Sequence, residues 1–170
     1  MKPDVEEIFR ELRRLEESAE LAAQTQFEQA KVWKTFHTWI SVPAALVAGL
    51  LALGTGGCLL ADLLSKEVAG GLVIAAAALG AIVVWLSAAD RATDAEASAN
   101  EYLALQGDAR VTRIIDLRVA EFGQAREMLA ELLEQQNSIN RQAPTASRVA
   151  RKRAARNVRE GGLKYNVDRP

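Results

Sequence analysis

PAALVAGLLALGTGGCLLA, residues 43–61, is a stretch without a charged side chain. A second stretch, VAGGLVIAAAALGAIVVWLSAA at residues 68–89, has none either, and only the six residues DLLSKE separate the two. The hydrocarbon core of a bilayer is about 30 Å thick, and a helix of roughly 20 apolar residues crosses it. Because 25% of the whole chain is charged, this segregation predicts two transmembrane helices, at about residues 39–61 and 68–89.

A buried helical hairpin inside a soluble bundle is the alternative interpretation of the two stretches. Helices of soluble proteins normally carry polar residues on one face, whereas these two stretches have almost none on any face. A cleaved secretory signal fits less well, because the first apolar run starts near residue 38, beyond the usual position of such a signal. We therefore favour two membrane spans.

Basic residues near the span ends predict the orientation of the hairpin. The connecting loop has one, Lys66, whereas residues 1–38 have six and residues 90–170 have fourteen. Both termini are therefore expected in the cytoplasm. Trp39 and Trp85 lie near the cytoplasmic ends of the predicted spans, and indole rings favour the membrane interface. Both are predicted interface anchors.

Residues 1–38 have the pattern of a long amphipathic helix. Its apolar positions alternate in spacings of three and four, as in a coiled coil; they are Val5, Ile8, Leu12, Leu15, Ala19 and Ala22. Gln26 then interrupts this seam. Pro43 lies where the helix would enter the membrane, and proline removes a backbone hydrogen bond. We expect a kink or a restart near residues 41–43, acting either as a hinge or as a fixed bend.

Two further helical segments are expected after the second span. The span continues to about residue 106, Gly107-Asp108 is a plausible break, and a helix follows at about 109–137. Its predicted apolar stripe is Ile115, Val119, Phe122, Ala125, Leu129 and Leu132. A turn at Ala143-Pro144-Thr145 precedes a basic helix at about 146–159, capped by Thr145 or Ser147.

The predicted fold class is all-α: a two-span transmembrane helical hairpin with long cytoplasmic helices packed as a coiled-coil-like bundle. Four regions follow from the patterns above. They are the amino-terminal cytoplasmic helix (1–38), the transmembrane hairpin (39–89), a cytoplasmic helical region (90–140), and a basic carboxy-terminal helix with its tail (141–170).

Small residues dominate one face of the first predicted span, at spacings of three and four: Thr38, Ser41, Ala45, Ala48, Ala52 and Thr55. The second span has two pairs of small residues four apart, Ala76 with Gly80 and Ala77 with Ala81. Such faces let membrane helices approach closely. They either seal the hairpin or also join protomers and line an opening. Because one hairpin cannot enclose a pore, any conduction requires a homo-oligomer.

The basic helix carries a patch of six cations: Arg148, Arg151, Lys152, Arg153, Arg156 and Arg159. Three partners are compatible with it. Anionic headgroups of the inner leaflet are one. The acidic segment 90–134 of the same or a neighbouring chain, with ten acidic and five basic residues, is another. Nucleic acid is the least favoured partner, because the segment has no aromatic residues for base stacking.

No catalytic or cofactor-binding pattern is found in the sequence. The chain has one histidine, His37, and one cysteine, Cys58, so a His/Cys metal cluster cannot be built within one chain. GTGG at residues 54–57 lacks the Lys-Ser/Thr of a phosphate-binding loop. We therefore expect no enzyme activity, no cofactor and no metal site.

The arrangement of the whole chain resembles the SLATT domain. The resemblance covers about residues 5–160 and rests on the amphipathic helix, the hairpin with a short loop, the returning helix and the segment LLEQQNSINRQAPTASRVARKRA at residues 132–154. SLATT proteins are two-span bacterial proteins associated with nucleotide second messengers and conflict systems. The resemblance is architectural and transfers no catalytic residue.

The resemblance implies a multi-pass protein of the bacterial inner membrane. It also implies an effector that oligomerises and perforates or depolarises that membrane in antiphage abortive defence. An upstream sensor protein or a nucleotide signal would then trigger it. Two other functions remain open: a non-conducting, membrane-anchored coiled-coil scaffold that recruits a cytoplasmic partner, and a holin-like phage protein.

Overall fold

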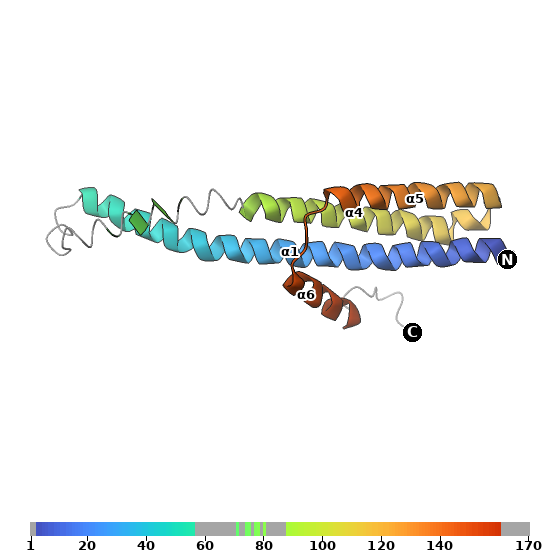
Figure 1. Ribbon diagram of the computed structural model, residues 1–170, viewed down its shortest axis with the longest axis horizontal. Coiled ribbons are helices and arrows are strands. Elements are labelled where there is room, and N and C mark those ends of the chain that lie inside the picture. Colours follow the sequence, from blue (N-terminus) through green and yellow to red (C-terminus); the bar gives the residue numbers. More distant parts are fainter. Residues whose placement is uncertain are drawn as a thin grey trace. The chain divides into compact units, whose positions relative to one another are not determined.

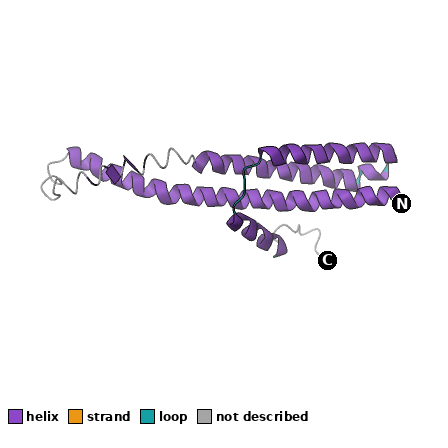
Figure 2. Ribbon diagram, in the orientation of Figure 1, coloured by secondary structure: helices purple, strands orange, loops and turns teal. Residues whose placement is uncertain are grey.

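The computed structural model describes residues 3–56, 71, 74–75, 77–78, 80 and 88–160, with the backbone alone for residues 3–4 and 43–56. Every regular element in these residues is a helix, as Figure 2 shows, which confirms the all-α class. The elements are α1 (Pro3–Gly56), α4 (Ala88–Ile114), η1 (Asp116–Arg118), α5 (Phe122–Gln142) and α6 (Arg148–Arg159).

The chain divides into two compact units. One comprises Met1–Lys31 and Thr93–Pro170 and is called the bundle unit below. The other comprises Val32–Ala92 and is called the hydrophobic unit. The predicted regions 1–38, 39–89, 90–140 and 141–170 remain predictions.

The bundle unit is built on α1, α4 and α5, which lie side by side (Figure 1). The core that they share with Leu117 of η1 consists mainly of aliphatic side chains, with one tyrosine; its members are Ile8, Leu12, Leu15, Ala19, Ala23, Tyr102, Leu105, Ala109, Leu117, Ala125, Leu132 and Ile139. The amino-terminal seam is confirmed, since four of its members are buried and Val5 and Ala22 are half-buried. Burial of this face stabilises α1 more than helix propensity alone does.

Polar contacts define the register of the three helices. Glu16 pairs with Arg113 and Glu20 with Gln106, so α1 and α4 are antiparallel. Three hydrogen bonds join α1 to α5 and the segment after it. Gln136 donates to Ser18, Gln26 to the Pro144 carbonyl, and the Ser147 N–H to Gln29. All three span 118 residues, so these segments run parallel to α1 in a constant register.

The break expected at Gly107-Asp108 is wrong, because α4 continues through it to Ile114. Leu105 and Ala109, on either side of the glycine, are fully buried. A glycine inside a helix costs about 1 kcal/mol, and burial of two core residues offsets that cost. Gly107 itself is exposed, and a Cβ there would meet nothing within 4 Å.

The chain turns instead at residues 115–121, and α5 starts after a capping box between Glu121 and Gln124. The predicted stripe is therefore only partly correct. Its first three members, Ile115, Val119 and Phe122, are 58%, 85% and 48% exposed. Its later members Ala125 and Leu132 are in the core and Leu129 packs against it, because the helix α5 begins only at Phe122 and turns these positions toward α1 and α4.

The helix α1 is continuous from Pro3 to Gly56 and passes through Pro43. The helix therefore does not restart at residues 41–43. Proline removes one backbone hydrogen bond, but the residues before and after Pro43 remain helical. The hinge role of Pro43 remains a prediction.

In the hydrophobic unit, aromatic and cationic side chains join α1 to α4. The rings of Trp33 and Phe36 meet edge to face, with centroids 6.1 Å apart. The Arg91 guanidinium lies 5.1 Å from the centroid of Trp33, within the range of a cation–π contact. Trp33 therefore packs between two helices.

Among the described residues, no helix combines the length and the apolar character needed to cross a membrane. The end of the first predicted span, the loop and most of the second, at 57–70 and in much of 72–87, lie outside those residues. The two-span hairpin is therefore not confirmed and remains a prediction.

An ion pair shielded from solvent connects α1 and α4. Arg113 Nη2 lies 2.8 Å from Glu16 Oε2, and the two side chains are only 19% and 15% exposed. The same guanidinium stacks 5.4 Å from the centroid of the Phe9 ring. Loss of the cation would leave the Glu16 carboxylate without a partner in a poorly solvated position.

We expect Arg113→Met to lower the free energy of unfolding by about 1–3 kcal/mol. The matched control is Arg13→Met, because the Arg13–Glu17 pair is 67% exposed on both sides and should contribute less than about 1 kcal/mol. Urea unfolding of the full chain measures both effects. Equal losses in the two variants would contradict a special role for the shielded pair.

The Glu20 carboxyl has a raised pKa, mainly because burial disfavours its charged form and also because Glu16 and Glu17 are close. The folded state therefore binds more protons than the unfolded state between the ordinary and the raised pKa, and stability falls as pH rises through that window. Above the raised pKa, the unfavourable contribution of the Glu20 carboxylate to folding has its full value.

Glu20→Gln is accordingly expected to raise the melting temperature at neutral pH. The corresponding gain in the free energy of unfolding should be small, about 0.2–0.5 kcal/mol, as for removal of a like-charge pair on a helix. Thermal melts of wild type and variant at neutral and acidic pH measure the difference. The gain should disappear at acidic pH, where the wild-type carboxyl is also uncharged; a gain independent of pH would argue against this cause.

Candidate functional site

The small-residue face of the first predicted span is described in part. Thr38 Oγ1 donates to the Lys34 carbonyl at 3.0 Å, and Ser41 Oγ lies 3.3 Å from His37 Nε2. The side chains of the other members, Ala45, Ala48, Ala52 and Thr55, lie outside the described residues. A role of this face in a pore remains a prediction.

The structure describes only some of the other residues that were predicted to lie in the membrane. Ala77 and Gly80 are helical and exposed, whereas Ala76, Ala81 and Trp85 lie outside the described residues. Trp39 is 76% exposed. Its role as an interface anchor remains a prediction, as does that of Trp85.

Four polar side chains of α1 are buried just beyond the apolar seam: Gln24, Gln26, Glu28 and Gln29 are 8%, 6%, 8% and 3% exposed. Buried polar groups need hydrogen-bond partners to offset lost hydration. Three of these side chains bind segments that follow α5, and we call Gln24, Gln26 and Gln29 the glutamine clasp.

The clasp holds the linker between α5 and α6. Gln26 Nε2 donates to the Pro144 carbonyl at 2.9 Å, and the Ser147 backbone N–H donates to Gln29 Oε1 at 2.8 Å. At the far end of α6, Asn157 Nδ2 donates to Gln24 Oε1 at 3.3 Å. Polar side chains thus help fix the linker and α6 to α1.

The basic helix α6 has two distinct sides. Ser147 caps its first turn by accepting from the Ala150 N–H at 3.3 Å, which confirms one of the two predicted caps. Ala150 and Ala154 are fully buried, while the six predicted cations are all exposed. Alanines on the buried side let α6 pack without burying a charge.

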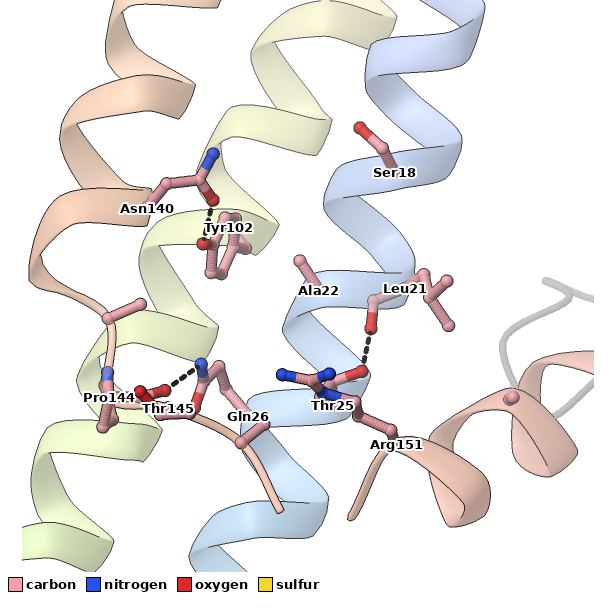
Figure 3. A pocket seen from close by; sticks show the side chains of 13 residues that line it. Ser18, Leu21, Ala22, Thr25, Gln26, Tyr102, Asn140, Pro144, Thr145 and Arg151 are labelled. Carbon is pink, nitrogen blue, oxygen red and sulfur yellow. Dashed lines mark hydrogen bonds between the residues drawn. The ribbon is translucent and has the colours of Figure 1, made fainter. Parts of the chain in front are cut away.

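A groove of about 630 Å³ opens beside the clasp (Figure 3). Three helices, the linker and α6 contribute its lining residues, namely Ser18, Leu21, Ala22, Thr25, Gln26, Tyr102, Asn140, Ala143, Pro144, Thr145, Ala146, Arg151 and Ala155. Tyr102 donates to Asn140 Oδ1 at 2.5 Å across it. Burial raises the pKa of the Tyr102 phenol, with a smaller effect of Glu101, so the phenol remains a hydrogen-bond donor at neutral pH.

Among the described residues, Arg151 is the only cation that lines the groove, and none of the described carboxylates lines it. Gln26 Oε1 is fully buried beside the groove and has no hydrogen-bond partner in the described part of the chain. The groove contains hydroxyl, amide and guanidinium groups. Its chemistry suits structural hydrogen bonding and the binding of polar groups.

The described residues hold no cluster of His, Cys, Asp or Glu able to bind a metal ion. Comparisons with protein-family models, with curated proteins and with solved structures found no significant match to this chain. The SLATT resemblance therefore rests on the sequence architecture alone.

Sequence reasoning missed the glutamine clasp. The run QTQFEQ at residues 24–29 contained a signal, since Gln26 interrupts an otherwise apolar seam. The pattern does not identify a partner, because Pro144 and Ser147 lie 118 residues away in sequence. Only the packing of α1 with α5 brings these residues together.

Gln29→Ala is expected to loosen the linker. It leaves the Ser147 N–H without its acceptor, a loss of about 1 kcal/mol, so amide exchange at residues 147–150 should become about fivefold faster. Hydrogen exchange of the full chain, followed by mass spectrometry, measures this. Gln142→Ala is the control, because its bond to Ser138 is exposed and 3.5 Å long; a similar change in both variants would count against the clasp.

Proposed function

We propose that this chain is an effector that oligomerises and perforates or depolarises the bacterial inner membrane, with both termini in the cytoplasm, in antiphage abortive defence. The observation that carries the proposal is the exclusion of charge from residues 43–61 and 68–89 in a chain that is 25% charged. A bilayer gives two such segments a favourable environment on every face.

The bundle unit supports a regulated activity rather than a simple anchor. It has its own core and a polar clasp that fixes the linker and α6 to α1. The same helix α1 contains the clasp residues and most of the first predicted span. A change in the clasp can therefore act on the residues proposed to enter the membrane.

The trigger is proposed to be an upstream sensor protein or a nucleotide signal. A polar groove lined by Arg151 and without a carboxylate is suited to an anionic group of such a signal. The resting clasp would hold the hairpins closed or dispersed, and its release would let them assemble in the bilayer. The bilayer itself, with its anionic headgroups, is a proposed partner.

The test is leakage from liposomes. Purified full chain reconstituted into dye-loaded vesicles should release the dye, and expression in bacteria should collapse the membrane potential reported by a voltage-sensitive dye. Ala48→Leu combined with Ala52→Leu should reduce both signals at least tenfold, because bulky side chains on the small-residue face keep the helices apart.

Val47→Leu is the matched control, because helical periodicity places residue 47 away from that face, and it should leave leakage unchanged. Normal membrane insertion of each variant must be verified by extraction with detergent. No leakage from the wild-type chain at any protein density, with insertion intact, would refute the pore.

A non-conducting scaffold is the second candidate. The apolar side chains of Ile115, Val119 and Phe122 are exposed at the turn between α4 and α5, and a recruited protein would cover them. This function predicts a membrane-bound chain that causes no depolarisation in the assays above.

A further inference from the structure

We propose that α6 of one copy of this chain docks in an acidic groove between α4 and α5 of a second copy. Both surfaces belong to the bundle unit. The first is a stripe of cations on α6. The second is a groove lined by three carboxylates and by three apolar side chains, which we call its floor.

The cations of α6 form one continuous stripe opposite its buried side. Ala150 and Ala154 are fully buried. With 3.6 residues per turn, the opposite side presents Arg148, Lys152, Arg156 and Arg159, all of them exposed. We call these four residues the basic stripe, and it extends about 17 Å along the helix.

The positive charges of the basic stripe are little neutralised by acidic side chains of the described part of the same chain. Among the described residues, Arg156 forms the only ion pair of the stripe, with Glu160 at 3.5 Å, and both side chains are mostly exposed. Such a surface pair contributes about 0–1 kcal/mol. Four cations therefore remain available for an anionic partner.

The acidic groove lies between α4 and α5 and has a volume of about 530 Å³. Its lining residues are Asp108, Val111, Thr112, Asp116, Met128, Glu131, Leu132 and Gln135. Its three carboxylates form no ion pair within the described residues 3–56 and 88–160. The apolar side chains of its floor would gain burial from a docked helix.

The basic stripe cannot reach the groove of its own chain. Gln24, Gln26 and Gln29 tie α6 and its linker to α1. The stripe is on the side of α6 opposite this contact and so points away from its own bundle. Val149, next to the stripe, is 52% exposed and offers an apolar contact to the floor of a neighbour's groove. Charge complementarity therefore favours a second copy as the occupant.

The two surfaces differ, so the contact is heterologous, and repeated contacts of this kind close into a ring or continue as a filament. A ring would gather several hairpins around one axis. That use of the contact rests on the proposed pore function, whereas the contact itself can be measured without any leakage assay.

The test is charge exchange in the full chain, with self-association measured by sedimentation in an uncharged detergent. Lys152→Glu alone and Glu131→Lys alone should each weaken association about tenfold, because each places like charges together. The double variant restores an opposite-charge pair at every contact and should regain most of the association. Added salt should weaken wild-type association.

Arg153→Glu and Glu127→Lys are the matched controls. They make the same charge changes on α6 and α5 outside the stripe and the groove lining, and should change association less than threefold. Circular dichroism verifies that every variant is folded. The proposal is overturned if the double variant does not recover, if the controls weaken association equally, or if the wild type does not associate.

A further outcome identifies the lipid alternative. If Lys152→Glu leaves association unchanged but reduces binding to vesicles containing phosphatidylglycerol, the stripe binds headgroups and the proposal fails. If association follows the charge pattern but no variant, including wild type, releases dye, the docking holds and the pore function fails.

Discussion

The bundle unit depends on small side chains at the contacts among its helices. Ala19 and Ala23 on α1, Ala109 on α4 and Ala125 on α5 are all fully buried. The distance between packed helices depends on the side chains between them, and alanine permits close approach. This proximity brings the polar part of α1 within hydrogen-bond distance of the linker after α5, so the clasp follows from the alanine packing.

The glutamine clasp adds specificity that contacts among the buried alanines lack. Alanines repeated at spacings of three and four fit against one another in several registers, because one methyl group resembles the next. The hydrogen bonds between Gln26 and Pro144 and between Gln29 and Ser147 fit only one register. A buried polar group left without a partner costs about 1–3 kcal/mol, so neighbouring registers are disfavoured.

Local patterns in the sequence predicted the helical class, the α1 seam and the Ser147 cap, because each depends on residues close together along the chain. The predictions around Gly107 failed because tertiary burial of Leu105 and Ala109 outweighs a local glycine signal. The acidic groove and the glutamine clasp were not predictable, since each joins residues from separate helices. The small-residue face of the spans was predicted from periodicity alone, and most of it lies outside the described side chains.

The constant offset between α1 and the segments parallel to it has a mechanical consequence. Three hydrogen bonds, at Ser18, Gln26 and Gln29, all span 118 residues, so they belong to one register and are spaced along the length of α1. A force that slides α1 lengthwise would load the three bonds together, as in shear. A force that lifts the linker sideways would load them one after another, as in peeling. These hydrogen bonds therefore resist a force along the helix axis better than a force across it.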